Sequence, residues 1–352
     1  MPDWLKSMQQ TFEYYIVDPG TWKDIRRLDT VKSCSITRDS SAETLGSAAI
    51  DITESVGECY VRAYMITIQN GIKEKHPLGT YLIQTPATRF DGKIQNVSVD
   101  AYTPLLELKE KYPPLGYSIT KNTNVMDIAY RLVRENLRAP VVKTSASTEL
   151  FTDFVAETSD TWMSFLIDLI ANAKYIFDLD EMGRVLFAPK QDIASLQPVW
   201  TYNDDNSSIL YPNLSMDHDL YGIPNVLEVI YSNGRDSYYA KVVNDDPNSP
   251  TSTVSRGRII PHRETDPNLI GDPTNNQIQE YAERRLRELS TIECTISYTH
   301  GYCPVRVGDC VRLNHSKANL KNVKAKVISQ TISCKPGCPV SEKAVFVHNF
   351  WR

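Results

Sequence analysis

The sequence lacks features that mark several large classes of protein. No stretch comes near the roughly eighteen consecutive apolar residues of a membrane-spanning helix, so no such helix is expected. No basic run exceeds a few residues, and 38 Lys and Arg against 43 Asp and Glu give a net charge of −5, which disfavours nucleic-acid binding as the main role. The first twenty residues have no basic start before an apolar core, so we expect no secretory signal and folding in a reducing cytoplasm.

The short motifs of common enzyme chemistry are also missing. The chain has no glycine-rich phosphate loop, no H-E-x-x-H zinc motif and no G-x-S-x-G nucleophile elbow. No pattern selects a pair of carboxylates for glycoside hydrolysis. Because the sequence names no nucleophile, base or cofactor for a reaction, it predicts a protein that is not an enzyme.

What is present indicates an ordinary folded protein rich in β-structure. The chain has 352 residues, of which 41% are hydrophobic and 23% charged, and this length favours two or three domains. Nineteen tyrosines and twenty prolines suit strands joined by many turns.

Alternating apolar and polar residues dominate the first part of the chain. The pattern runs through "KSCSITRDS", "GSAAIDITES" and "CYVRAYMITIQNG", with an Asn-Gly turn at the end of the last. Further along, Val97, Val99 and Ala101 alternate with polar residues. Strands at this spacing predict a closed or nearly closed antiparallel β domain over 1–108, in which Cys34 and Cys59 are buried thiols.

The middle part, 109–192, is predicted as a small α/β domain. One helix should begin near 122–124 and end near 136. The apolar spacing in "SDTWMSFLIDLIANA" predicts a second helix with Ser159 as its N-cap. A hairpin should follow, with its turn at "DEMG", and its acidic residues fail the calcium-loop spacing. We expect that turn to be solvated.

The last part, 193–352, is predicted as a second β domain interrupted by one helix at about 275–289. It contains a hairpin around "SNGRD", a polar loop at 245–258 without core residues, and four final strand candidates. Those four are taken as a simple meander. The predicted fold is therefore mostly β with an α/β insert, in which two β-barrel-like tube domains flank a small α/β domain.

The order of these parts, and several local patterns, resemble a known family. The patterns are "SDTWMSFLIDLIANAKYIFDLDEMGRVLF", "IPNVLEVIYSNG" with the Ser/Thr-Arg-Gly loop beyond it, and "NNQIQEYAERRLREL" followed by "YCPVRVGDCVRL". Together they resemble the central baseplate hub of contractile phage tails and related injection machines, the late-control-protein-D-like hub family.

The resemblance implies a structural role and a set of partners. Three copies would form a ring whose six tube domains join the hexameric tail tube to the trimeric central spike, with a channel for DNA. The expected partners are the tail tube protein, the spike, other baseplate proteins and a tape measure protein. No specific nucleic-acid binding is expected. The expected location is the tail baseplate of a virion that assembles in the host bacterial cytoplasm.

Two other functions stay open on the sequence alone. A tail-associated enzyme that degrades cell wall, such as a peptidase or muramidase, would fit the same particle. A surface-binding β module is favoured only by the tyrosine content.

Four cysteines near the C-terminus are the candidate site. In a simple meander, Cys303 and Cys310 would reach the same end of the last β domain as Cys334 and Cys338 in "CKPGCPV". Four thiolates at one point could hold zinc or an iron–sulfur cluster, could pair as two disulfides outside the cell, or could stay unlinked. The neighbouring histidines, His300 and His315, are not assigned as ligands. A structural clamp holding zinc or iron–sulfur is the hypothesis taken forward.

Overall fold

The computed structural model describes residues 2–91, 94–206, 208–218, 220–232, 236–265, 267 and 274–349. It divides into two compact units, and each is described by itself. The first unit comprises Met1–Leu214 with Tyr298–Lys343, and the second Ser215–Ser297 with Ala344–Arg352. The expected three-part division at 108 and 192 stays a prediction. No helix within the described ranges is long and apolar enough to cross a membrane.

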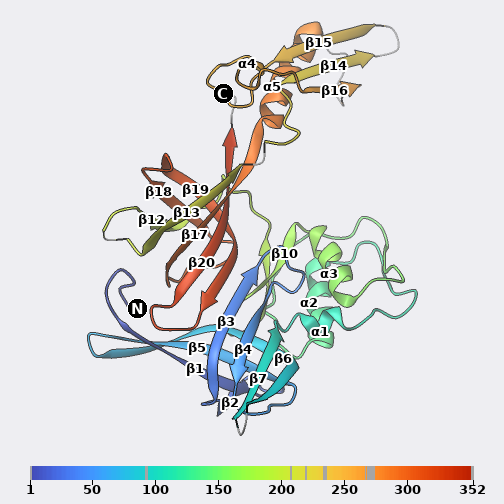
Figure 1. Ribbon diagram of the computed structural model, residues 1–352. Helices are drawn as coiled ribbons and strands as arrows, with labels where there is room; N and C mark the ends of the chain where they lie inside the picture. The colour runs from blue at the N-terminus through green and yellow to red at the C-terminus, as the bar shows by residue number, and fades with distance from the viewer. Residues whose placement is uncertain are drawn as a thin grey trace. The chain divides into compact units, whose positions relative to one another are not determined.

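The N-terminal strands of the first unit form an antiparallel sheet in the order β3-β4-β7-β6-β5-β1-β2 (Figure 1). They are β1 (Gln9–Val17), β2 (Asp24–Arg27), β3 (Val31–Asp39), β4 (Gly46–Ile52), β5 (Cys59–Gln69), β6 (Ile72–Asp91) and β7 (Ile94–Tyr102). The expected strands are confirmed, and the turn at Asn70 and Gly71 takes positive φ at both positions, as a tight hairpin requires. The predicted turn at 91–92 lies partly outside the described residues.

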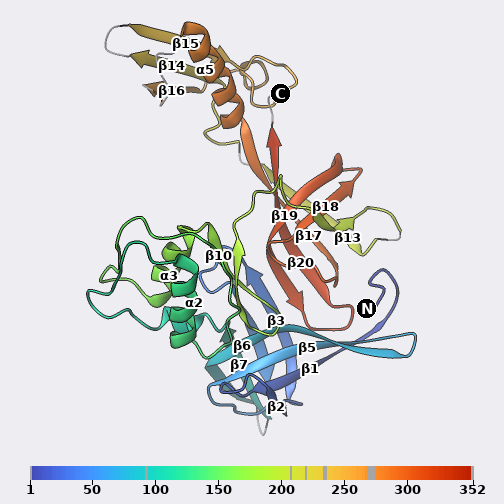
Figure 2. The same ribbon diagram turned by 180° about the vertical axis from the view of Figure 1, so that it is seen from behind.

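The helices of the first unit pack together against one face of that sheet. They are α1 (Leu106–Lys109), α2 (Val125–Asn136) and α3 (Trp162–Ala171), accompanied by the short strands β8 (Ser118–Ile119) and β9 (Phe154–Val155) and the hairpin of β10 (Tyr175–Leu179) and β11 (Val185–Pro189). Their apolar faces share one core with Val17, Tyr60 and Leu82 of the sheet. Both views show α2 and α3 beside β10 (Figure 1, Figure 2).

Sequence signals placed these helices well, with one error at a cap. The α2 helix begins after Asn124, whose side chain accepts a hydrogen bond from the Asp127 amide. The α3 helix begins after Thr161, which forms a capping box with Ser164, so the prediction of Ser159 as N-cap was wrong. The reciprocal pairing of Thr161 and Ser164 satisfies two backbone donors, which Ser159 could not do from two residues upstream.

The C-terminal strands continue the N-terminal sheet. They are β12 (Pro198–Tyr202), β13 (Leu210–His218), β17 (Thr291–Gly301), β18 (Cys310–His315), β19 (Leu320–Ser333) and β20 (Pro339–Asn349). Among the described residues, thirteen strands form one sheet, in which β19 pairs with both β18 and β3. The chain is mostly β as predicted, but within the described ranges the pairing of these strands runs along an open path and closes no barrel.

The predicted meander of the last four strands was wrong. The order is β17-β20-β19, and β18 lies on the other side of β19, where it also pairs in parallel with β12. The chain therefore crosses from one edge of this group to the other between Gly301 and Cys310. A meander was inferred because strands that follow each other in sequence usually pair. Here, among the residues that the structure describes, β18 pairs with β12 and β19, and not with β17.

The second unit has its own sheet and core. Its strands β14 (Val226–Ser232), β15 (Ser237–Val243) and β16 (Pro261–Thr265) form a three-stranded sheet in the order β15-β14-β16, covered by α5 (Asn275–Leu289). The predicted helix is confirmed, with Ile278, Ala282 and Leu286 wholly buried. The short helix α4 (Thr253–Arg256) lies in the polar loop.

That polar loop has buried residues, contrary to the prediction. Ser249, Thr251 and Ser252 are almost wholly inaccessible. The side-chain amide of Asn244 donates to the hydroxyls of Ser249 and Thr251 at 3.0 and 3.3 Å. Hydrogen bonding to a buried asparagine, which hydropathy does not register, holds Ser249 and Thr251 inside.

Candidate functional site

The turn between β10 and β11 is where separate segments of the first unit meet. Asp180 organises it by accepting hydrogen bonds from the backbone amides of Met182 and Arg184 at 3.0 and 2.8 Å. Gly183 has φ +75°, and a Cβ there would come within 2.7 Å of the Thr80 side chain. Only glycine combines this backbone conformation with so close an approach.

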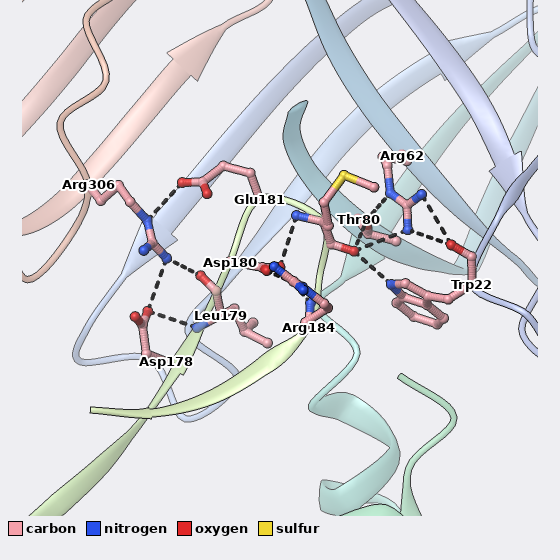
Figure 3. A network of polar contacts seen from close by, with 10 residues as sticks. Trp22, Arg62, Thr80, Asp178, Leu179, Asp180, Glu181, Arg184 and Arg306 are labelled. Carbon is pink, nitrogen blue, oxygen red and sulfur yellow. Dashed lines mark hydrogen bonds and ion pairs between the residues drawn. The ribbon is translucent and has the colours of Figure 1, made fainter. Parts of the chain in front are cut away.

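One backbone carbonyl of the turn is held by three donors. The Met182 oxygen accepts from Trp22 Nε1 at 2.7 Å, Thr80 Oγ1 at 3.0 Å and Arg62 Nη2 at 3.1 Å (Figure 3). Arg62 is 1% exposed, and its charge is balanced by Asp24 at 2.8 Å. The N-terminal sheet is therefore bound to the hairpin through the buried guanidinium of Arg62, whose donors are all hydrogen-bonded.

Two acidic side chains of the same hairpin, Asp178 and Glu181, face the loop between β17 and β18. Glu181 pairs with Arg306 at 2.8 Å, and Arg306 also reaches Asp178 at 3.4 Å (Figure 3). Glu181 also lies 3.7 Å from Arg38. Burial raises the pKa of Asp178, and the charge of Arg306 opposes that rise. The prediction of a solvated turn was wrong, because basic residues far away in the sequence fold over these carboxylates.

A second polar group lies wholly inside the C-terminal strands. His300 Nε2 lies 3.2 Å from Glu342 Oε2 and 3.1 Å from the Tyr202 hydroxyl, while its Nδ1 lies 2.7 Å from the Gly301 carbonyl. Both His300 and Glu342 have fully buried side chains. Tyr298 and Gln330 also donate hydrogen bonds to Glu342.

The electrostatics of this group favour a protonated histidine. Burial alone would lower the pKa of His300, but hydrogen bonds with Cys303 and Glu342, together with the carboxylate charge, raise it to about 10. A protonated ring donates from both nitrogens, which matches the acceptors at Gly301 and Glu342. His300 and Glu342 therefore form an internal ion pair at neutral pH.

Cys303, His300 and Glu342 are the residue types of a nucleophile, base and acid, but their geometry does not suit that chemistry. Cys303 Sγ is 3.9 Å from His300 Nδ1, a nitrogen already directed at the Gly301 carbonyl. All three side chains are sealed from solvent, with Cys303 only 2% exposed. A protonated imidazole without substrate access cannot serve as a general base. The group is a hydrogen-bonded core, which the sequence did not predict because His300 stands in no motif.

One open cavity of about 280 Å³ lies beside β12. Its lining residues are Leu5, Pro198, Val199, Trp200, Thr201, Asn203, Ser208 and Ile209. None of these side chains titrates near neutral pH, so the cavity offers no acid, base or charged ligand.

The four candidate cysteines fall in different surroundings. Cys303 lies in the polar core, with its sulfur 3.2 Å from the Tyr202 hydroxyl. Cys310 begins β18 opposite Lys326. Cys334 follows the end of β19. At the rise of an extended strand it lies about 25 Å along β19 from Lys326, the residue opposite Cys310. Cys334 and Cys338 share a core with Cys34, which the sequence assigned to no site.

This arrangement gives the proposed metal clamp no support. Over the described ranges, no group of three or more His, Cys, Asp or Glu could hold a metal ion. The thiol of Cys303 contacts Tyr202 and His300. Cys310 lies opposite Lys326, far along β19 from Cys334. The four thiols therefore do not fit a four-thiolate site. The zinc or iron–sulfur hypothesis stays a prediction, which metal analysis of anaerobically purified protein would test.

Two phage tail proteins resemble this chain along nearly its whole length. The tail protein of Neisseria meningitidis MC58 superposes with a TM-score of 0.60 at 14% identity, covering 97% of this chain and 98% of that one. The 43 kDa tail protein of prophage MuSo2 from Shewanella oneidensis gives 0.59 at 12% identity, covering 96% and 98%. This chain has the fold of phage tail proteins.

A longer chain from a two-protein complex shares the same fold. A chain of the Francisella PdpA–VgrG complex superposes with a TM-score of 0.55 at 8% identity, covering 98% of this chain and 53% of that longer one. No protein-family profile matches the sequence, and no curated protein does. The expected likeness to phage tail proteins is therefore confirmed in the fold.

Proposed function

We propose that this protein is the structural hub of a phage tail baseplate. In the proposal, two tube domains per copy, in a ring of three copies, join the hexameric tail tube to the trimeric central spike and leave a channel for DNA. Other baseplate proteins and a tape measure protein contact the ring, and the assembly forms in the host cytoplasm. The observation that carries this proposal is the end-to-end fold match with two phage tail proteins.

The internal construction of the first unit supports a structural role rather than catalysis. Its N-terminal and C-terminal strands share one sheet through β19 and β3. Arg62 and Arg306 hold the β10–β11 turn from two directions. These charged side chains hold separate segments of the chain together. The buried group of His300 and Glu342 is closed to substrates.

The charge of the chain also suits a DNA channel. A lumen lined with many lysines and arginines would hold DNA through phosphate contacts and slow its passage. With a net charge of −5, the chain has no excess of such residues.

The ring is tested by mass and symmetry. We expect native mass spectrometry of the purified full chain, alone or mixed with its tube and spike proteins, to give three copies per assembly, and electron microscopy to show a threefold ring. A chain that stays monomeric and joins neither partner would contradict the hub.

A peptidoglycan zymogram separates the hub from a wall-degrading enzyme. The hub predicts a blank lane beside a positive muramidase control. Clearing by the chain that survives further purification would favour the enzyme instead.

A further inference from the structure

Three thiols gather where the N-terminal sheet meets the C-terminal strands. The β19–β3 pairing runs from Ser329 opposite Asp39 to Ser333 opposite Ser35. One step further along the same register, Cys334 comes opposite Cys34, and its amide donates to the Cys34 carbonyl at 3.0 Å. Cys338 lies in the same apolar core. The topology thus places cysteines from opposite ends of the sequence directly across from each other.

The side chains make the same pairing. The thiol of Cys334 lies close enough to the Cys34 thiol to raise its pKa, and both thiols raise the pKa of the Tyr14 phenol. Cys34 is 6% exposed, whereas Cys334 is only partly buried. A dissolved reagent can therefore reach Cys334 first, with Cys34 already beside it.

We propose that Cys34 and Cys334 form a disulfide once the protein leaves the reducing cytoplasm. Residues opposite each other in a hydrogen-bonded antiparallel pair have Cα atoms about 5.5 Å apart. This separation lies within the range of about 4.4–6.8 Å that disulfides span. The register selects Cys34 over Cys338 as the partner, because Cys34 faces Cys334 across the strands.

The oxidant is a small disulfide such as oxidised glutathione. Cys334 releases its proton, its thiolate attacks one sulfur of the oxidant, and one glutathione thiolate leaves. Cys34 then releases its proton and attacks the Cys334 sulfur, which expels the second glutathione. Two protein thiols are oxidised, one disulfide is reduced to two glutathione thiolates, and these take up the two protons.

The bond would link the N-terminal strands covalently to the C-terminal strands where β3 pairs with β19. It would tie β3 to the turn before β20, next to the pairs that β19 makes with β3. It would also cross-link positions 34 and 334, so that most of the chain lies within one covalent loop. Such a loop restricts the unfolded state strongly.

The test uses the full-length reduced protein incubated with oxidised glutathione. Free thiols are then alkylated, and the digest is analysed by mass spectrometry without reduction. We expect a cross-linked peptide pair containing Cys34 and Cys334. Cys338→Ser and Cys59→Ser should keep this pair, and Cys34→Ser should lose it. The melting temperature should rise on the order of 5 °C on oxidation and return with dithiothreitol.

Other products of the same digest would overturn the proposal. These are a Cys334–Cys338 link, a link between two chains, glutathione that stays on Cys334, or all seven cysteines still alkylated. The decisive measurement is made on the unmodified sequence, so a variant that fails to fold does not affect it.

Discussion

Arg62 and His300 are charged side chains that the fold places in its interior. Each guanidinium nitrogen of Arg62 donates a hydrogen bond, and both ring nitrogens of His300 have an acceptor. A buried charge costs several kcal/mol of desolvation unless its partners are complete. These residues therefore fix one arrangement of their neighbours, because any other would leave a charge unpaired.

At this scale the His300–Glu342 pair predicts a pH dependence. The folded pKa of about 10 lies above the ordinary value of 6.5. The pair's contribution is therefore full below pH 6.5 and is lost as the pH rises towards 10. The other titratable groups facing His300 are Cys303, Tyr202 and Tyr298. We expect urea-unfolding free energies to fall by a few kcal/mol, about 1.4 for each pKa unit, across this window.

Glu342→Gln provides the matched variant for that measurement. It removes the carboxylate that keeps His300 protonated, so it should lower the unfolding free energy by about 3–5 kcal/mol at pH 6. It should also flatten the slope between pH 6.5 and 10. A variant that keeps the wild-type slope would assign the pH dependence to another group.

Among the elements, the β10–β11 hairpin shows how one turn can connect several segments. Its strands and turn position were predictable from alternation and from Gly183. Its surroundings were not, because Arg62, Arg306 and Arg38 come from three distant parts of the chain. Sequence alone predicts that an acidic turn is solvated, because it does not show that the fold places those arginines beside it.

A pair of glycine substitutions tests whether the turn is clamped. Gly183 and Gly116 have nearly equal φ, +75° and +76°, but a Cβ at Gly116 meets nothing within 4 Å. Each change to alanine should cost about 1–2 kcal/mol through the backbone. Gly183→Ala should cost about 1–3 kcal/mol more, because its Cβ meets Thr80. Urea denaturation of both variants checks this, and equal losses would mean that the contact with Thr80 yields freely.

On the scale of the whole molecule, the β19–β3 pairing matters most for folding. Ile332 and Val340, from the last fifth of the chain, are buried in the same core as Ile36 and Ile50 of the N-terminal sheet. The sequence suggested that the first β domain ends at 108, and its local strand pattern supports that boundary. The pattern contains no sign that the core is completed from positions beyond 330.

A fragment experiment follows from that shared core. Residues 1–192 expressed alone would leave β3 with an unpaired edge and a core without Ile332, Cys338 and Val340. We expect this fragment to aggregate or to melt without cooperativity in gel filtration and circular dichroism. Co-expression with 193–352 should restore a soluble complex. A monomeric fragment with a sharp thermal transition would show that the N-terminal sheet folds by itself.

The sequence by itself determined the local elements: most of the strands, the three main helices, the hairpin turns and the likeness to tail hubs. These depend on residue periodicity, caps and turn chemistry, which act over a few positions. Only the tertiary structure decided that β18 pairs with β12, that Cys334 faces Cys34, and that Glu181 meets Arg306. Such contacts join distant segments, and their free energy comes from packing and charge pairing that no single stretch of sequence contains.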